Sequence, residues 1–204
     1  MEKWLKWAIE IQSLAQIGLT YTQDVYDRER YEKLREISAE MLSEKTGLNK
    51  EKVKNLFCNE TGYQTPKLDT RAAIFNNNKI LLVHENNGTW SLPGGWCDVM
   101  ESVKSNTEKE VREETGLNVK AVKIISIQDR NKHNKPIYAY GVCKIFVLCE
   151  IIDGEFSENI ETTEICYFSL KDLPTNLAEE KTNKEQIKMC FKAISDENWQ
   201  TQFD

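Results

Sequence analysis

The sequence has no long hydrophobic run and no feature of an exported chain. Its longest uninterrupted apolar stretch, Ile145 to Cys149, is five residues long, whereas a membrane-spanning helix needs about 18. A signal peptide requires an apolar segment near the start. The first ten residues instead include four charged ones: Glu2, Lys3, Lys6 and Glu10. We therefore expect neither a membrane span nor an export signal.

Closely spaced cysteines and an excess of positive charge are also missing. The six cysteines contain no C-x-x-C pair, so the sequence predicts buried free thiols in a cytoplasmic protein rather than a disulfide framework or a zinc site. They are Cys58, Cys97, Cys143, Cys149, Cys166 and Cys190. Lys and Arg number 27 against 33 Asp and Glu, a net charge of −6. Nucleic acid is therefore not expected as a partner, and an acidic protein that acts on phosphates needs metal ions.

What the chain does have is 204 residues with 40% apolar content, enough for one medium domain and one small domain. Residues 1–66 show helical periodicity only, in one apolar stripe from Trp4 to Leu19 and another from Tyr31 to Leu42 that ends at Gly47. A third helix starts at the N-cap residue Asn49. It carries Val53, Leu56 and Phe57, and the linker Asn59 to Pro66 follows. We predict a small all-helical N-terminal domain, residues 1–66.

Residues 67–204 show strand patterns as well as helical ones. Two short apolar runs, 71–75 and 79–84, flank Asn76-Asn77-Asn78 and predict a hairpin. Further strands are expected at Val119–Gln128, Ile137–Ile152 and Ile165–Phe168, with helices at Ser102–Thr115 and Lys184–Ile194. Strands that alternate with helices predict an α/β domain with a mixed β-sheet.

Three carboxylates follow a glycine pair in this second part. Gly94 and Gly95 allow a backbone to approach a ligand closely. Glu110, Glu113 and Glu114 fall within an arc of about 100° on the predicted helix. Like charges so placed repel unless a cation sits among them, and hard oxygen ligands select Mg²⁺ or Mn²⁺. Magnesium commonly completes its coordination shell with phosphate oxygens of a substrate and activates water. Hydrolysis of a phosphoanhydride is therefore the expected reaction. On the glutamates alone, a solvated amphipathic helix is an equal alternative.

The spacing resembles the Nudix box, G-x5-E-x7-R-E-U-x-E-E-x-G-U, where U is apolar. The chain departs from it only at Lys109, where the family has arginine, and lysine cannot form the two-pronged pair with a carboxylate. The resemblance extends over about two-thirds of the chain, from Leu68 to Ile194. The matching positions are Gly95, Glu101, Glu110, Val111, Glu113, Glu114, Gly116 and Leu117.

The resemblance implies a Nudix α/β/α sandwich at residues 67–204 and assigns roles to several residues. Lys109 is expected to brace Glu101 and the neighbouring glutamates. The resemblance leaves the general base open between Glu110, which can also orient or deprotonate the water, and three glutamates of a later loop. The implied metal ligands are Glu110, Glu113, Glu114 and the Gly94 carbonyl, and the candidate bases are Glu158, Glu161 and Glu164.

The helical part also resembles the extensions of bacterial Nudix enzymes of the ADP-ribose and CDP-choline pyrophosphatase type. That likeness implies cleavage of a nucleoside diphosphate linked to another moiety, with CDP-choline the favoured substrate and ADP-ribose the alternative. A Nudix fold that only senses a nucleotide is a further alternative. Residues 1–58 hold ten basic and ten acidic residues and include Trp4 and Trp7 on one amphipathic stripe. An exposed aromatic stripe favours self-association, and we predict a homodimer.

Overall fold

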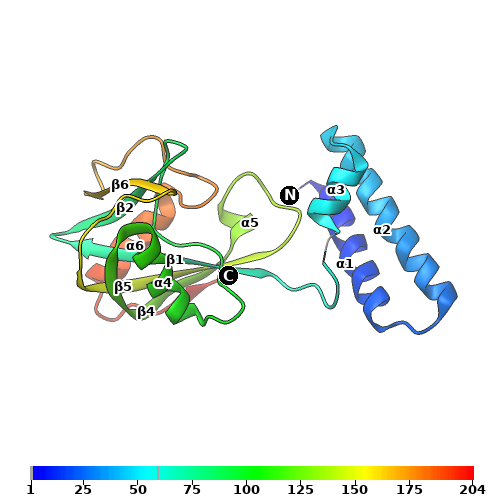
Figure 1. Ribbon diagram of the computed structural model, residues 1–204, viewed down its shortest axis with the longest axis horizontal. Coiled ribbons are helices and arrows are strands. Elements are labelled where there is room, and N and C mark those ends of the chain that lie inside the picture. The colour runs from blue at the N-terminus through cyan, green and yellow to red at the C-terminus, as the bar shows by residue number, and fades with distance from the viewer. Residues whose placement is uncertain (1, 59) are drawn as a thin grey trace. The chain divides into compact units, whose positions relative to one another are not determined.

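The computed structural model describes residues 2–58 and 60–204, which form two compact units (Figure 1). The first unit comprises Met1–Pro66 together with Ile137–Gly141, and the second comprises Lys67–Pro136 and Val142–Asp204. This grouping differs from the division at residues 66 and 67 only in the short segment Ile137–Gly141. Across the described residues, no helix is long and apolar enough to cross a membrane.

In its described residues the first unit contains three helices: α1 (Lys3–Tyr21), α2 (Val25–Thr46) and α3 (Lys50–Phe57). Their ends follow capping chemistry. Asp24 accepts a hydrogen bond from the Asp27 amide, Gly47 ends α2 with φ of 68°, and Asn49 accepts from the Glu51 amide. The small core consists of Ala8, Ala39, Leu42, Val53 and Cys58. The predicted roles of the Leu56 and Phe57 side chains, and of Asn59 in the linker, lie outside the described part of the chain.

The second unit is built on a mixed sheet, as predicted. Strand order is β3-β2-β1-β5-β4-β7, and β6 pairs with β2. β1 lies parallel to β5 and β4 parallel to β7, whereas β1–β2, β2–β3, β2–β6 and β4–β5 are antiparallel. The strands are β1 (Lys67–Asn76), β2 (Lys79–Glu85), β3 (Trp90–Ser91), β4 (Leu117–Asp129), β5 (Val142–Gly154), β6 (Thr162–Phe168) and β7 (Gln202–Phe203).

Helices cover both faces of this sheet. Alternate residues of β1 face opposite ways, so Ala73 belongs to the core under α6 (Lys184–Ser195). Ala72 and Ile74 belong to the core under α4 (Val103–Thr115), which contributes Val111. The α/β/α sandwich is therefore confirmed. A short helix, α5 (Arg130–His133), lies between β4 and β5 in the chain.

Two predicted strands have different starts. The strand expected from Ile137 begins at Val142, because residues 137–141 group with the helical unit, where Ala139 packs against the small core. The strand expected from Ile165 begins at Thr162, because its pairing with β2 continues to Glu85. The hairpin is confirmed, since Asn77 and Asn78 take the positive φ angles of 49° and 57° that its turn requires.

Candidate active site

Residues 92–95, here called the glycine segment, pair with β1 and extend the sheet locally. The Ala72 amide donates to the Pro93 carbonyl at 2.8 Å, and the Thr70 amide donates to the Gly95 carbonyl at 2.9 Å. Gly94 has φ of 136°, and a Cβ there would lie 2.0 Å from the Thr70 carbonyl oxygen. Only glycine allows this approach between the two backbones.

Helix α4 carries the predicted carboxylates to this segment. Ser102 begins the helix with a capping box to Ser105, and Gly116 ends it with φ of 75°. With Val111 buried against the sheet, Glu110 and Glu114 lie one turn apart beside the glycines. Glu114 Oε2 accepts a hydrogen bond from the Gly94 amide at 2.8 Å. A Cβ on Gly95 would lie 2.6 Å from Glu110 Oε2, so the second glycine makes room for that carboxylate.

These two carboxylates lack enough neighbouring positive charge to offset their burial. Burial raises the pKa of Glu114 to about 7, although Arg71 and the Gly94 amide oppose the shift. Burial likewise raises the pKa of Glu110, against the effect of Lys109. A divalent cation beside them would favour both ionised forms.

Lys109 holds three carboxylates on the open side of the site. Its Nζ lies 2.8 Å from Asp98 Oδ2, 3.2 Å from Glu113 Oε2 and 3.4 Å from Glu110 Oε1. The Asp98 interaction is the largest cause of the raised pKa of Lys109. Lys109 is expected to brace Glu101 and the neighbouring glutamates; among the described residues its ion pairs are with the neighbouring Glu110 and Glu113 and, in place of Glu101, with Asp98.

The predicted metal ligands are only partly brought together. Within the described residues, no three His, Cys, Asp or Glu side chains are arranged so that they could hold a metal ion. Glu110 and Glu114 meet at the glycine segment, whereas Glu113 is half-exposed and ion-paired with Lys109. The donor chemistry still fits a hard cation, since two carboxylates of raised pKa and the adjacent Gly94 backbone supply oxygen ligands.

The candidate bases lie on exposed chain beyond β5. Asn159 Nδ2 donates to the carbonyls of Glu113 and Glu114 at 3.0 Å each, which ties this loop to the end of α4. Glu158 and Glu161 flank that anchor and are exposed. Glu164 is also exposed but lies farther along, in β6 opposite His84.

Several polar residues that support the site were missed from the sequence. Arg71 and Asp69 form a buried pair on β1, and Asn106 Nδ2 donates to Thr70 Oγ1 at 2.9 Å. Lys181 Nζ lies 2.7 Å from Glu85 Oε2. A signal for the first pair exists, since two residues of opposite charge stand two apart directly before the apolar run Ala72 to Phe75.

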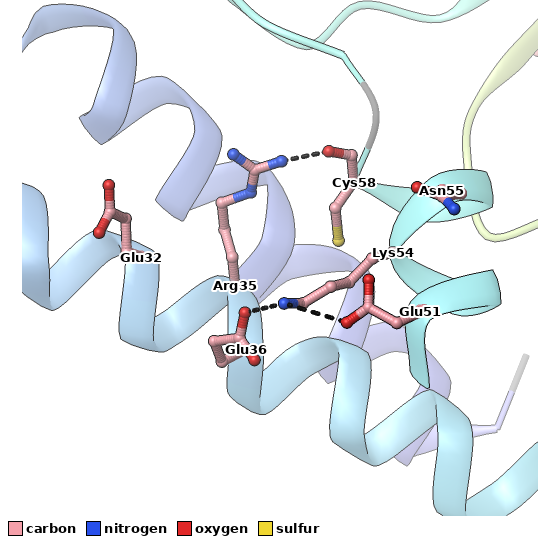
Figure 2. A pocket seen from close by; sticks show the side chains of 7 residues that line it. All are labelled: Glu32, Arg35, Glu36, Glu51, Lys54, Asn55 and Cys58. Carbon is pink, nitrogen blue, oxygen red and sulfur yellow. Dashed lines mark hydrogen bonds and ion pairs between the residues drawn. The ribbon is translucent and has the colours of Figure 1, made fainter. Parts of the chain in front are cut away.

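A second cluster of carboxylates lies in the helical unit, where neighbouring lysines lower a glutamate pKa that burial raises at α4. A cavity of about 350 Å³ there is lined by Glu32, Arg35, Glu36, Glu51, Lys54, Asn55 and Cys58. Figure 2 shows Lys54 directed at Glu36 and Arg35 at the Cys58 carbonyl. Lys50 and Lys54 lower the pKa of Glu36 to about 2. Because this carboxylate is already compensated by lysines, we place the candidate active site at α4.

Comparisons with known proteins agree with this architecture. Residues 65–190 match the family model of the NUDIX domain, and residues 2–57 match that of a UDP-X-like, N-terminal oligomerisation domain. The chain is 39% identical over 203 residues to YjhB of Bacillus subtilis, provisionally named an ADP-ribose pyrophosphatase, covering 99% of this chain and 97% of that protein. The chain belongs to the Nudix family, and the prediction of a Nudix enzyme is confirmed.

Two solved structures are similar in sequence as well as in fold. A crystal structure of a Streptococcus suis ADP-ribose pyrophosphatase is 53% identical with a TM-score of 0.64, covering 69% of this chain and 100% of that one. A crystal structure of a UDP-X diphosphatase is 34% identical with a TM-score of 0.65, covering 98% of this chain and 97% of that one. The second of them spans both units of the present chain.

Proposed function

We propose that this protein is a Mg²⁺- or Mn²⁺-dependent pyrophosphohydrolase that splits a nucleoside diphosphate-linked compound into two monophosphates. The observation that carries the proposal is the juxtaposition of Glu110 and Glu114 with Gly94 and Gly95, which places two incompletely compensated carboxylates beside a backbone that a ligand can approach closely. A pyrophosphate brings further negative charge and needs a cation at the same place.

The residues divide the work as follows. Glu110 and Glu114 would hold the cation, and the Gly94 carbonyl and Glu113 would supply further oxygen ligands. The metal, when bound, neutralises the pyrophosphate and lowers the pKa of the attacking water. Lys109 keeps Asp98 and Glu110 in place, as its ion pairs indicate. A base in the loop after β5 takes the proton of that water, and the Asn159 anchor favours Glu158 or Glu161 over Glu164.

CDP-choline is our favoured substrate and ADP-ribose the second candidate. CDP-choline follows from the resemblance of the whole chain, including its helical part, to enzymes of that type. ADP-ribose is favoured by the names of the Bacillus and Streptococcus relatives. The UDP-X diphosphatase adds uridine conjugates to the compounds worth testing.

The deciding experiment is a chromatographic assay of the two monophosphate products with Mg²⁺ on CDP-choline, ADP-ribose and a UDP-sugar, run on the wild type and on Glu114→Gln. We expect turnover of one conjugate and a loss of several orders of magnitude in kcat for the variant, because glutamine keeps the size but removes the charge of a ligand. Binding of a conjugate without any product would instead establish a nucleotide sensor. Equal turnover with EDTA and with excess Mg²⁺ would refute the metal-dependent mechanism.

We further propose that the helical unit forms the junction of a homodimer in a reducing compartment, the cytoplasm. Trp7, Leu14 and Tyr21 recur every seven residues on α1, with exposed fractions of 54%, 64% and 68%. Such a stripe gains most from burial against a second copy. The family model matched by residues 2–57 describes an oligomerisation domain. All six cysteines are free thiols, in keeping with that compartment.

A further inference from the structure

Arg71 is a buried cation on β1 that donates a hydrogen bond to the Leu92 carbonyl, where the glycine segment begins. It lies on β1 between Thr70 and Ala72, whose amides hold the carbonyls of Gly95 and Pro93. Its side chain points to the other face of the strand and is only 5% exposed. A bound nucleotide therefore has no access to it, and its role has to be exerted through its neighbours.

The guanidinium joins three parts of the chain. Nε and one terminal nitrogen donate to the two Asp69 carboxylate oxygens at 2.8 and 2.9 Å, and the other terminal nitrogen donates to the Leu92 carbonyl at 3.2 Å. Leu92 is the residue that leads into Pro93-Gly94-Gly95. The two-pronged pair fixes the plane of the guanidinium, and that plane fixes the donor aimed at Leu92.

The exit of the same loop is held from the same strand. Asn106 Nδ2 donates to Thr70 Oγ1 at 2.9 Å, and its Oδ1 accepts from the Asp98 amide at 3.1 Å. Arg71 thus secures the entry of the loop while Thr70 and Asn106 secure its exit. Gly94 lies between these two attachments, and its amide meets Glu114.

We propose that Arg71, oriented by Asp69, is a positioning residue that fixes the Leu92–Gly95 turn so that the Gly94 backbone and Glu114 stay in register. This role rests on the proposed function but goes beyond it, because neither Arg71 nor Asp69 belongs to the Nudix box. Only the planar fork reaches both Asp69 and Leu92, so a lysine keeps the charge and loses the geometry.

The test compares Arg71→Lys with Arg130→Lys. Arg130 is a second buried arginine, 2% exposed, whose Nη1 donates to the Pro136 carbonyl in the same unit. With CDP-choline or ADP-ribose and Mg²⁺, Arg71→Lys should lower kcat about 10- to 100-fold, because misplacement by an ångström has costs of that order. KM should stay within about twofold, because bound substrate does not touch the side chain. Arg130→Lys should leave both values near those of the wild type.

A second measurement does not depend on turnover. Amide hydrogen exchange in peptides covering residues 92–98 should speed up at least about tenfold in Arg71→Lys and stay unchanged in Arg130→Lys. Asp69→Asn should also lower kcat. The double variant Asp69→Asn/Arg71→Lys should lose less kcat than the product of the two single losses, because both substitutions disrupt the same contact.

The outcomes separate this proposal from the proposed function. If the wild type cleaves no conjugate but exchange at 92–98 responds to Arg71→Lys alone, the positioning role stands and the enzyme assignment fails. If the two lysine variants lose the same kcat and exchange alike, or if Arg71→Lys raises KM and leaves kcat intact, Arg71 does not position the turn.

Discussion

Replacing Gly94 by alanine tests whether the close approach of two backbones underlies the site. The new Cβ would lie 2.0 Å from the Thr70 carbonyl oxygen and 3.0 Å from the Arg71 Cα, both backbone atoms that cannot rotate away. The residue also has φ of 136°, where an L side chain is strained by about 1–2 kcal/mol. Relieving the clash separates the turn from β1 and sacrifices hydrogen bonds worth about 1 kcal/mol each.

Two such bonds flank Gly94, from the Thr70 and Ala72 amides. Together with the strain, their loss predicts that Gly94→Ala lowers the free energy of unfolding by about 3–4 kcal/mol. Gly88→Ala is the matched control, because Gly88 has φ of 84° but no atom within 4 Å of its added Cβ. It should cost only the strain, about 1–2 kcal/mol.

Urea unfolding followed by circular dichroism measures both costs in stability, and the chromatographic assay of the monophosphate products measures the effect on the site. We expect Gly94→Ala to lose at least about 100-fold in kcat, since the Gly94 amide moves away from Glu114, and Gly88→Ala to keep its activity. Equal destabilisation by the two alanines, or an active Gly94→Ala enzyme, would refute the reasoning.

Three further predictions concern charge and assembly. Burial raises the pKa of Glu114 from 4.5 to about 7, so the folded protein binds this proton more tightly than the unfolded chain. In EDTA, the free energy of unfolding of the wild type should therefore fall by up to about 3 kcal/mol relative to that of Glu114→Gln as the pH rises from 4.5 to 7. Urea unfolding at the two pH values measures this, and an unchanged difference between wild type and variant would contradict it. Lys109→Arg should keep wild-type kcat/KM in steady-state assays while Lys109→Met loses about 10- to 100-fold, because only a cation bridges the surrounding carboxylates; an active Lys109→Met would remove that role. Light scattering should give twice the chain mass of 23.7 kDa for the wild type and for Thr20→Asp, which lies off the aromatic stripe, but a single chain for Leu14→Asp. A dimeric Leu14→Asp would move the interface elsewhere.

Local patterns in the sequence were sufficient for most elements of the fold. Helix α4 is an example, because Ser102, the buried Val111 and Gly116 supply its cap, its core contact and its end within one short stretch. The start of β5 could not be predicted in this way. Residues 137–141 continue the apolar run of the strand, and only their packing with the helical unit removes them from the sheet. That packing depends on residues far away in the chain.

The supporting residues of the site were hidden for a related reason. Arg71 is the first residue of the run 71–75 from which the strand is predicted, and its partner Asp69 lies outside that run, between it and the linker that ends at Pro66. Their importance comes from the Leu92 carbonyl, about twenty residues away, which meets Arg71 only after β1 and the glycine segment have paired. A spacing rule describes residues of one helix or strand, so it finds Glu110 and Glu114 and misses the arginine behind them.

Electrostatics finally separates functional from structural glutamates where residue type does not. Glu36 and Glu114 are both helical glutamates whose pKa values are lowered in part by basic groups. Lys50 and Lys54 lower the pKa of Glu36 to about 2, while burial raises that of Glu114 to about 7 in spite of Arg71. Glu36 is satisfied by its own chain and has nothing to gain from a ligand. Burial disfavours the ionised form of Glu114, and a bound cation would offset that cost, which is the physical reason to look for the metal at α4.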